Sequence, residues 1–320
     1  MLKKILVILL VVLLLASIFV SVGFGQERNK NKQTERVRTM TIPISIFTKK
    51  ERKESRADEF IQAGDLKVEE DGDDQVILSI RSVTNTPLAL AILIQDDLTA
   101  ETNLKLDEIR KFIRSLPRGS RVMVAYLRAG TIQVRQKFTD DLEKAAKSLR
   151  IIVGSSSAAP SSPYQGVEEA LKRFDALPTG RRAVLLVSDG LDLSQGFQSS
   201  SPSQSIDLDR AILRAQRKSV AVYSFYSPAS ATGSGNSILI LNGQGSLERL
   251  SDETGGRAFF QGSIAPISFN PFFDDLNLAL NRQFALTFLS THMKKGYHKL
   301  KVTSTNREVE IEHPRGYYYR

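Results

Sequence analysis

Polar and apolar residues alternate with a period of two in the first part of this chain. The pattern predicts strands over Thr41–Thr48 and, within Asp65–Ser82, over the segments DLKVEED and QVILSIRS. The pair Asp71-Gly72 between those segments is typical of a tight hairpin turn, because both residues tolerate the left-handed backbone that such a turn needs. These strands are too few to be stable alone, and we expect them to pair with another part of the chain.

The pattern changes at Leu88, where strands begin to alternate with helices. Leu88–Ile94 is an unbroken apolar run that ends at Asp96, and Arg182–Val187 is a second apolar strand that ends at Asp189. Runs of this length are typical of strands buried on both faces of a parallel sheet, with helices covering both faces. The predicted helices are Leu104–Leu116, Asp140–Leu149, Gln165–Leu177, Ile206–Lys218, Leu247–Thr254 and Phe272–Arg282.

The last part of the chain returns to strand-like patterns. These cover Phe284–Ser290, Lys299–Ser304 and Glu308–Glu312. We expect them to complete the thin β unit at the other end, so that one small β domain is built from both ends of the chain. The predicted parts are an N-terminal β segment (39–85), an α/β domain (86–282) and a C-terminal β segment (283–320) that packs with the first.

The first residues carry a targeting pattern. Lys3 and Lys4 precede the apolar run Ile5–Val20, and small residues follow as far as Gly25. This layout predicts a secretory signal over residues 1–25, followed by a flexible lead over 26–38. An uncleaved membrane anchor is the alternative. In both cases we expect the rest of the chain to be exported to the periplasm, the cell envelope or the exterior.

Composition narrows the possible partners and chemistry. The chain is 41% hydrophobic and 25% charged, as in a globular protein. Its formal net charge is +9, but the basic residues are scattered among acids rather than gathered on one helix. We therefore do not expect nucleic acid as a partner. The sequence contains no cysteine, which excludes disulfides and thiolate metal sites.

Five stretches in order carry a resemblance to a known family. They are DLKVEEDG from Asp65, ILIQDDL from Ile92, AVLLVSDGLD from Ala183, and the closing segments RQFALTFLS and KLKVTSTNREVEIEHPRGYY. Together they resemble the exported bacterial proteins related to von Willebrand factor A (VWFA) domains. The resemblance implies a Rossmann-like α/β domain, with a mostly parallel central sheet and helices on both faces, and a small β domain built from the flanking strands.

The resemblance also implies a metal-ion-dependent adhesion site at the end of the sheet. In the family a D-x-S-x-S loop, a Thr and an Asp hold a magnesium ion that binds a partner's carboxylate. Here Asp96 and Asp189 match the two Asp positions, and Ser161 stands for the Thr, with Ser162 as a weaker candidate. The two serine positions hold Leu98 and Ala100, which offer no side-chain oxygen, and Thr99 lies one residue out of place.

The expected site is therefore degenerate, with no cofactor or a weakly bound magnesium ion. We expect a non-enzymatic module that binds another protein, and a working magnesium site is the alternative. A third hypothesis is an α/β hydrolase or phosphotransferase that uses Asp96, but the usual D-x-D-x-T order and the G-x-S-x-G elbow are missing. We expect Asp192 to be a solvated loop acid. The three histidines, His292, His298 and His313, are expected at surface or turn positions.

Overall fold

The structure is a computed structural model, and it describes residues 37–49, 65–83, 86–154, 161–178 and 180–319. Every element named below belongs to the unit Arg38–Arg320. The predicted signal segment lies outside the described residues. Within the described ranges, no helix combines the length and the apolar character that a membrane span needs.

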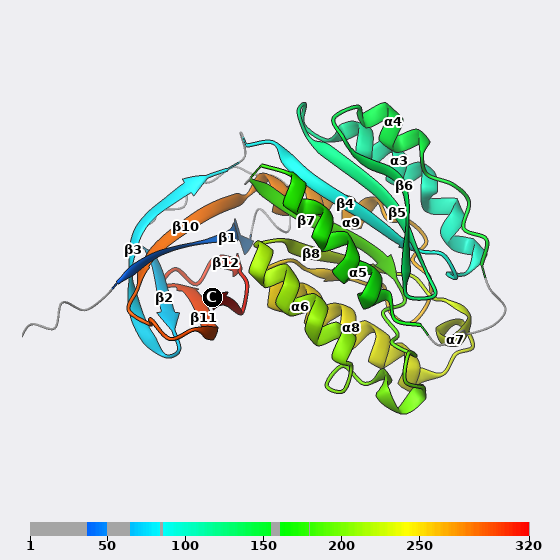
Figure 1. The fold of residues 1–320 in the computed structure, drawn as a ribbon. Coiled ribbons are helices and arrows are strands. Elements are labelled where there is room, and N and C mark those ends of the chain that lie inside the picture. The colour runs from blue at the N-terminus through cyan, green and yellow to red at the C-terminus, as the bar shows by residue number, and fades with distance from the viewer. Residues whose placement is uncertain (1–36, 50–64, 84–85, 155–160, 179, 320) are drawn as a thin grey trace, which may run out of the picture. The chain divides into compact units, whose positions relative to one another are not determined.

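The first sheet has six strands in the order β6-β5-β4-β7-β8-β9 (Figure 1). Its strands are β4 (Leu88–Gln95), β5 (Arg121–Arg128), β6 (Thr131–Thr139), β7 (Arg181–Ser188), β8 (Ala221–Tyr226) and β9 (Ala258–Phe259). All neighbours run parallel except β6, which pairs with β5 in the antiparallel sense. β4 lies between β5 and β7, and all eight of its residues are buried, as its apolar run predicts.

Helices cover both faces of this sheet (Figure 1). Alternate residues of β4 enter two separate cores, with Ile92 in the core under α3, α4 and α9 and Leu93 in the core under α5, α6 and α8. The helices are η3 (Ala100–Lys105), α3 (Leu106–Ser115), α4 (Leu142–Lys147), α5 (Pro163–Lys172), η4 (Arg173–Ala176), η5 (Phe197–Ser200), α6 (Ile206–Lys218), α7 (Ser230–Gly233), α8 (Ser237–Thr254) and α9 (Asn270–Asn281).

The start of α8 corrects a prediction. The helix begins at Ser237, ten residues before the predicted start at Leu247, and Gly243 and Gly245 lie inside it. Glycine is unfavourable in the interior of a helix, and for this reason the sequence pattern did not predict the first half of α8. Gly243 has a packing reason, because a Cβ at that position would lie 2.1 Å from the carbonyl oxygen of Asp189. The glycine therefore lets α8 approach the turn after β7.

The second sheet has seven strands in the order β12-β1-β10-β3-β2-β11-β13. They are β1 (Arg38–Thr48), β2 (Leu66–Glu70), β3 (Asp73–Ser82), β10 (Gln283–Ser290), β11 (Gly296–Ser304), β12 (Val309–Glu312) and β13 (Gly316–Tyr319). β1 pairs with β10 and β12, β3 pairs with β10, and β2 pairs with β11, so each of these N-terminal strands has a C-terminal strand as a neighbour. This confirms the expected β domain built from both flanks.

The predicted hairpin joins β2 and β3. Asp71 and Gly72 both adopt left-handed backbone conformations, with φ of 51° and 98°. The turn is therefore of the type that Asp-Gly favours. Leu66 and Val68 of β2 pack with Leu286 and Val302 of the C-terminal strands in one core.

The two sheets are joined by polar and aromatic contacts. Arg181 at the start of β7 donates to the side chain of Gln283 at 3.2 Å and to the carbonyl oxygen of Leu280. α6 packs against β13, and the guanidinium of Arg217 lies 4.2 Å from the ring centre of Tyr318. The second sheet thus contacts the edge of the first sheet where β7 begins, away from the ends of β4 and β7 that carry Asp96 and Asp189.

Candidate functional site

The side chain of Asp96, directly after β4, is paired with an arginine. Its carboxylate is 1% exposed. Arg150 donates from Nη1 to Oδ1 at 2.7 Å and from Nη2 to Oδ2 at 2.9 Å, so that both oxygens are bonded to one guanidinium. A second cation, Arg128 of β5, lies 3.8 Å from Oδ2. The bidentate arrangement is the strongest geometry for an arginine–carboxylate pair.

Arg150 is itself held in place. Its guanidinium lies 4.1 Å from the ring centre of Tyr126, which adds a cation–π contact. The Tyr126 hydroxyl donates to the Arg150 carbonyl oxygen at 2.7 Å and accepts from the Arg150 N–H at 2.9 Å. The hydrogen bonds to Asp96 raise the pKa of Arg150 above its ordinary value. A fixed positive charge therefore lies against Asp96.

Asp189, directly after β7, lies in a different environment. It is 2% exposed, and its oxygens accept from the Leu191 N–H at 3.1 Å and from the Thr232 hydroxyl at 3.2 Å. Burial raises its pKa to about 7, and the charge of Asp97 adds to the rise. The negative charge of Asp97 therefore acts on Asp189, whereas Asp96 is paired with a guanidinium.

The other predicted ligands lie around the turn that carries Asp189. The carbonyl oxygen of Ser161 accepts from the Leu193 N–H at 2.9 Å, which places this segment beside the turn. The hydroxyl of Ser162, at the start of α5, is buried and has no hydrogen-bond partner among the described residues. Thr99 donates its N–H to the Pro228 carbonyl oxygen at 2.8 Å, in the loop before α7.

Two residues of this region could not be found from the pattern. Thr232 lies in α7 and bonds Asp189, but the sequence shows only a Gly/Ser-rich loop there. Arg150 lies 54 residues after Asp96, past the end of α4, and no short motif links the two. A basic residue at that position has no signature of its own, because scattered arginines are ordinary on surfaces.

Asp192 corrects another prediction. It is 2% exposed rather than solvated. Its carboxylate accepts from the Ser194 N–H at 3.0 Å and the Ser194 hydroxyl at 2.7 Å, and also from the Ser205 hydroxyl. The Ser205 oxygen in turn caps α6 by accepting from the Leu208 N–H at 3.1 Å. Asp192 therefore organises the polar loop between β7 and α6.

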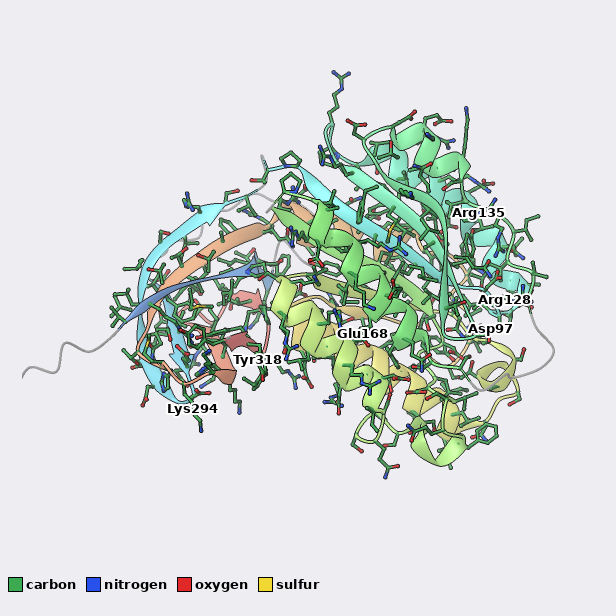
Figure 2. The ribbon with its side chains drawn as sticks, viewed as in Figure 1. Asp97, Arg128, Arg135, Glu168, Lys294 and Tyr318 are labelled. Carbon is green, nitrogen blue, oxygen red and sulfur yellow. The ribbon has the colours of Figure 1, made fainter. Side chains whose placement is uncertain are left out.

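Exposed apolar side chains surround this end of the sheet. Leu104, Ile151 and Val153 are 77%, 69% and 72% exposed, and hydrogen bonds between Asn103 and Ile152 at 2.7 and 3.2 Å tie their two segments together. On η5 and α8, further apolar side chains are exposed. These are Phe197, Ile238 and Leu241. Figure 2 shows Asp97 and Arg128 at the same end of the sheet, where β4 and β5 end.

A hollow of about 750 Å³ lies elsewhere, at the start of β7 and the end of α6. Its lining includes Arg182, Arg214, Arg217 and Lys218, together with Tyr318 of β13 (labelled in Figure 2). The residues that the sequence predicts as a site do not line it. The candidate site is thus a surface formed by loops at the ends of β4, β5 and β7.

The strand order of the first sheet decides the fold. When its strands are numbered in chain order from β4, the sheet has the order 3-2-1-4-5-6. The strand order reverses between the first and fourth strands, and in doubly wound sheets ligands bind at the carboxyl ends of the strands at such a point. Only the third strand, β6, runs antiparallel. This is a von Willebrand factor A-related fold. Asp96 and Asp189 follow the two strands on either side of that crossover, β4 and β7.

Comparisons with known proteins give likenesses of structure only. No family model matches the chain, and no curated protein matches it. An aerotolerance-related membrane protein from Bacteroides fragilis is 12% identical, with 61% of this chain and 98% of that chain covered and a TM-score of 0.43. A von Willebrand factor type A structure from Catenulispora acidiphila is 11% identical, with 82% and 76% covered and a TM-score of 0.42.

A third likeness is the von Willebrand factor domain of a type V pili tip protein from Porphyromonas gingivalis. It is 11% identical, with 62% of this chain and 94% of that chain covered and a TM-score of 0.41. Likenesses at these values say nothing about a shared partner or site. The fold assignment rests on the order and direction of the chain's own strands.

Proposed function

We propose that this chain is an exported, non-enzymatic binding module of the von Willebrand factor A type that docks another protein without a bound cation. The observation that carries the proposal is the bidentate pair between Asp96 and Arg150. A cation-dependent adhesion site needs oxygen ligands with free lone pairs and an open coordination position. The guanidinium takes both oxygens of the first expected ligand and supplies the positive charge itself.

The residues around Asp96 support the same conclusion. Leu98 is fully buried and Ala100 begins η3, so the two positions that would hold serine ligands contribute no oxygen. The family's magnesium ion therefore does not fit the set Asp96, Ser161 and Asp189. We infer that Asp96 serves to fix Arg150 and the loop that follows α4.

The surface around this pair suits contact with a protein. Leu104, Ile151 and Val153 form an exposed apolar patch next to the loop that Arg150 anchors, and clustered exposed apolar residues mark interaction surfaces. Arg128 lies beside them with a side chain that is 56% exposed, and it can pair with a partner's carboxylate. The proposed docking surface thus combines apolar contacts with one accessible cation.

The enzyme hypothesis finds little support at this position. An aspartyl nucleophile needs an accessible carboxylate oxygen. The Asp96 carboxylate is 1% exposed, and both of its oxygens are bonded to Arg150. The apolar N-terminal run supports export, and the cell envelope is our proposed location.

A capture experiment tests the proposed function. The full chain is incubated with a cell-envelope extract of the producing organism and cross-linked, in buffer with magnesium or with EDTA. We expect one partner to be captured equally in both buffers and to be lost in the variant Ile151→Asp/Val153→Asp. The matched control is Val76→Asp, because Val76 is 64% exposed but lies in β3 of the second sheet.

One observation favours the cation-dependent alternative. Burial raises the pKa of Asp189, and the charge of Asp97 adds to the rise, so the two carboxylates lie close enough to repel and a bound magnesium ion would reduce that repulsion. In that case EDTA would abolish capture, and Asp189→Ala would do the same without any change in far-ultraviolet circular dichroism.

A further inference from the structure

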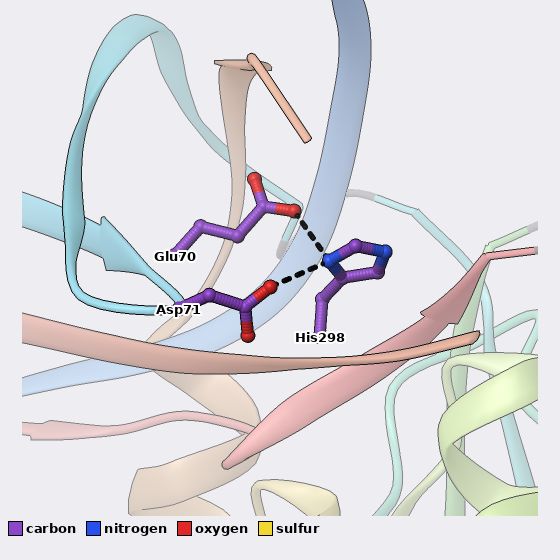
Figure 3. Close-up of side chains that lie close together, drawn as sticks. All are labelled: Glu70, Asp71 and His298. Carbon is purple, nitrogen blue, oxygen red and sulfur yellow. Dashed lines mark hydrogen bonds and ion pairs between the residues drawn. The ribbon is translucent and has the colours of Figure 1, made fainter. Parts of the chain in front are cut away.

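A second group of ionisable side chains lies in the other sheet (Figure 3). Glu70 ends β2, Asp71 begins the hairpin turn, and His298 lies in β11 with only 3% of its surface exposed. The Nδ1 atom of His298 is 2.8 Å from Oδ2 of Asp71 and 3.3 Å from Oε1 of Glu70. The prediction that the histidines occupy surface or turn positions is therefore wrong for His298.

The contact of Nε2 of His298 determines which ring nitrogen carries the proton in the neutral imidazole. Nε2 lies 2.6 Å from the carbonyl oxygen of Lys294, which can only accept a hydrogen bond. Nε2 therefore carries a proton, and in the neutral ring Nδ1 presents its lone pair to two carboxylates. Lone pairs facing each other repel, so a positive species must lie between them. It is either a second proton on the ring or a metal ion.

His292 repeats this arrangement. Its Nε2 atom lies 3.2 Å from Oδ2 of Asp73, and its Nδ1 atom lies 3.9 Å from Oε2 of Glu70. The Glu70 side chain is fully buried, and neither Oε2 of Glu70 nor Nδ1 of His292 has a hydrogen-bond partner among the described residues. Two unpaired polar atoms thus point at each other across a gap that a metal ion could bridge.

The opposite atom of each carboxylate is already held. Oδ1 of Asp71 accepts from the Lys299 N–H at 2.8 Å, and Oε1 of Glu70 accepts from the Tyr317 hydroxyl at 2.5 Å. One ligand atom each of Glu70, Asp71 and His298 lies within 4.8 Å of the other two, and these bonds fix their side chains. His292 lies at the margin of this group, with Nδ1 3.9 Å from Oε2 of Glu70. Outer contacts of this kind are typical of residues that bind a metal.

We propose that Glu70, Asp71 and His298 form a binding site for a divalent metal ion of the zinc class, with His292, 3.9 Å from Oε2 of Glu70, as the fourth ligand. Two imidazoles and two carboxylates suit zinc or a similar transition metal, whereas magnesium and calcium prefer oxygen ligands. In a tetrahedral zinc site, ligand atoms lie roughly 3.3 Å apart, given bonds of about 2.0 Å. The Nδ1 atom of His298 lies 2.8 Å from Oδ2 of Asp71, and the Nδ1 atom of His292 lies 3.9 Å from Oε2 of Glu70, so shifts of about half an ångström bring both pairs to that value.

Charge balance is consistent with a divalent ion. The neighbouring charged groups are Glu70, Asp71, Asp73 and Arg38, whose Nη2 atom lies 3.6 Å from Oε1 of Glu70. With neutral imidazoles these groups carry a formal charge of −2, which one divalent ion cancels. Arg38 approaches the Glu70 oxygen that Tyr317 also bonds, and this leaves Oε2 free for the metal.

The site would connect the two ends of the chain. Asp71 and His298 are 227 residues apart in sequence, and the whole α/β domain lies between them. A metal bound to both fixes the hairpin of β2 and β3 to β11 and to the segment after β10. Asp71 is 35% exposed, which gives a metal ion a path from solvent. The proposed role is therefore structural, as a metal staple of the second sheet.

Calorimetry with zinc and visible absorption with cobalt test the proposal. The full chain, purified without an affinity tag, is titrated with zinc chloride at pH 7.5. We expect one equivalent to bind, with cobalt giving the intense visible bands of a tetrahedral site. His292→Ala and Asp71→Asn should each weaken zinc binding by about tenfold or more. His313→Ala is the matched control, because His313 accepts from the Val302 N–H outside the cluster.

Several results would overturn the metal site. One is a folded wild-type chain that binds neither zinc nor cobalt. Another is zinc binding that survives both His292→Ala and Asp71→Asn but is lost in Asp189→Ala. A third is nuclear magnetic resonance showing both imidazoles doubly protonated at pH 7.5 and unchanged by zinc. We expect His292→Ala to fold, since the His292 side chain is 23% exposed.

Discussion

The end of β4 and the turn between β2 and β3 both hold buried carboxylates, but different groups neutralise them. At β4 a guanidinium is bonded to both oxygens of Asp96. At the hairpin, the Nδ1 atoms of two imidazoles lie near Glu70 and Asp71, and Oε2 of Glu70 has no hydrogen-bond partner among the described residues. A carboxylate that resembles a family metal ligand can thus be closed to metal, while carboxylates that do not belong to the family's ligand set can be open to it.

The largest expected effect is that of Arg150→Ala. Removing the guanidinium leaves a buried carboxylate without its main partner, and such losses cost about 3 kcal/mol in the free energy of unfolding. Urea denaturation measures the change. Arg135→Ala, at an exposed position of β6 (labelled in Figure 2), should change the free energy by less than about 0.5 kcal/mol. Adding Asp96→Asn to Arg150→Ala should restore most of the loss.

A loss below about 1 kcal/mol for Arg150→Ala would show that the pair is not the neutralising contact that its geometry indicates. A double variant Arg150→Ala/Asp96→Asn that is no more stable than Arg150→Ala would lead to the same conclusion. It would show that the charge left on Asp96 does not cause the loss of stability.

The second largest effect is the pH dependence that Asp189 gives to the free energy of unfolding. Its pKa is raised to about 7, against about 3.9 in an unfolded chain, so the folded state binds the extra proton between these values. Its contribution to stability is complete below about pH 4 and is lost as the pH rises through 7. Asp189→Asn removes this loss, and its free energy of unfolding relative to wild type should rise by about 2–3 kcal/mol between pH 5 and 8.

The measurement is urea denaturation of both proteins at a series of pH values. A difference between Asp189→Asn and wild type that stays constant from pH 5 to 8 would contradict the prediction. It would mean that a cation, or another group, holds Asp189 ionised in the folded chain.

Tyr126→Phe should have a smaller effect. The hydroxyl makes two hydrogen bonds to the backbone of Arg150, at 2.7 and 2.9 Å, while the ring contact with the guanidinium survives the substitution. We expect a loss of about 1–2 kcal/mol in the free energy of unfolding. Tyr297→Phe is the control, because Tyr297 is 46% exposed. Equal losses in the two variants would argue against a specific anchor for Arg150.

The smallest effect is expected for Gly72→Ala. The glycine has a φ of 98° and open space around its Cβ position, so only the backbone conformation opposes alanine, at about 1 kcal/mol. Because the turn aims Asp71 at His298, zinc affinity should fall with stability. Gly119→Ala, also at positive φ with open space, should lower stability but leave zinc affinity unchanged. Unchanged zinc affinity in Gly72→Ala would show that the conformation of the turn is not needed for zinc binding.

Local patterns were enough to predict most of the fold. The apolar run of β4 and the Asp-Gly turn each follow from neighbouring residues, and both were confirmed. The start of α8 was missed because Gly243 is needed for the close approach of α8 to Asp189. Helix propensity depends on local sequence and does not include such a distant contact. Prediction of secondary structure from local sequence thus fails where packing against a distant turn determines which residue is used.

The candidate site was predictable only in part. Asp96 and Asp189 follow buried strands and could be found from the pattern. Arg150 could not, since its link to Asp96 spans 54 residues and depends on where the loop after α4 returns to the sheet. The cluster of Glu70 and His298 was equally hidden, because strand pairing between the ends of the chain creates it.

The most direct test of the central claim is calorimetric titration of the full wild-type chain with magnesium, since two imidazoles make the hairpin cluster a poor magnesium site. We predict no binding at millimolar magnesium, because Arg150 already neutralises Asp96. Binding of one magnesium ion per chain, abolished by Asp96→Ala or Asp189→Ala, would contradict the account.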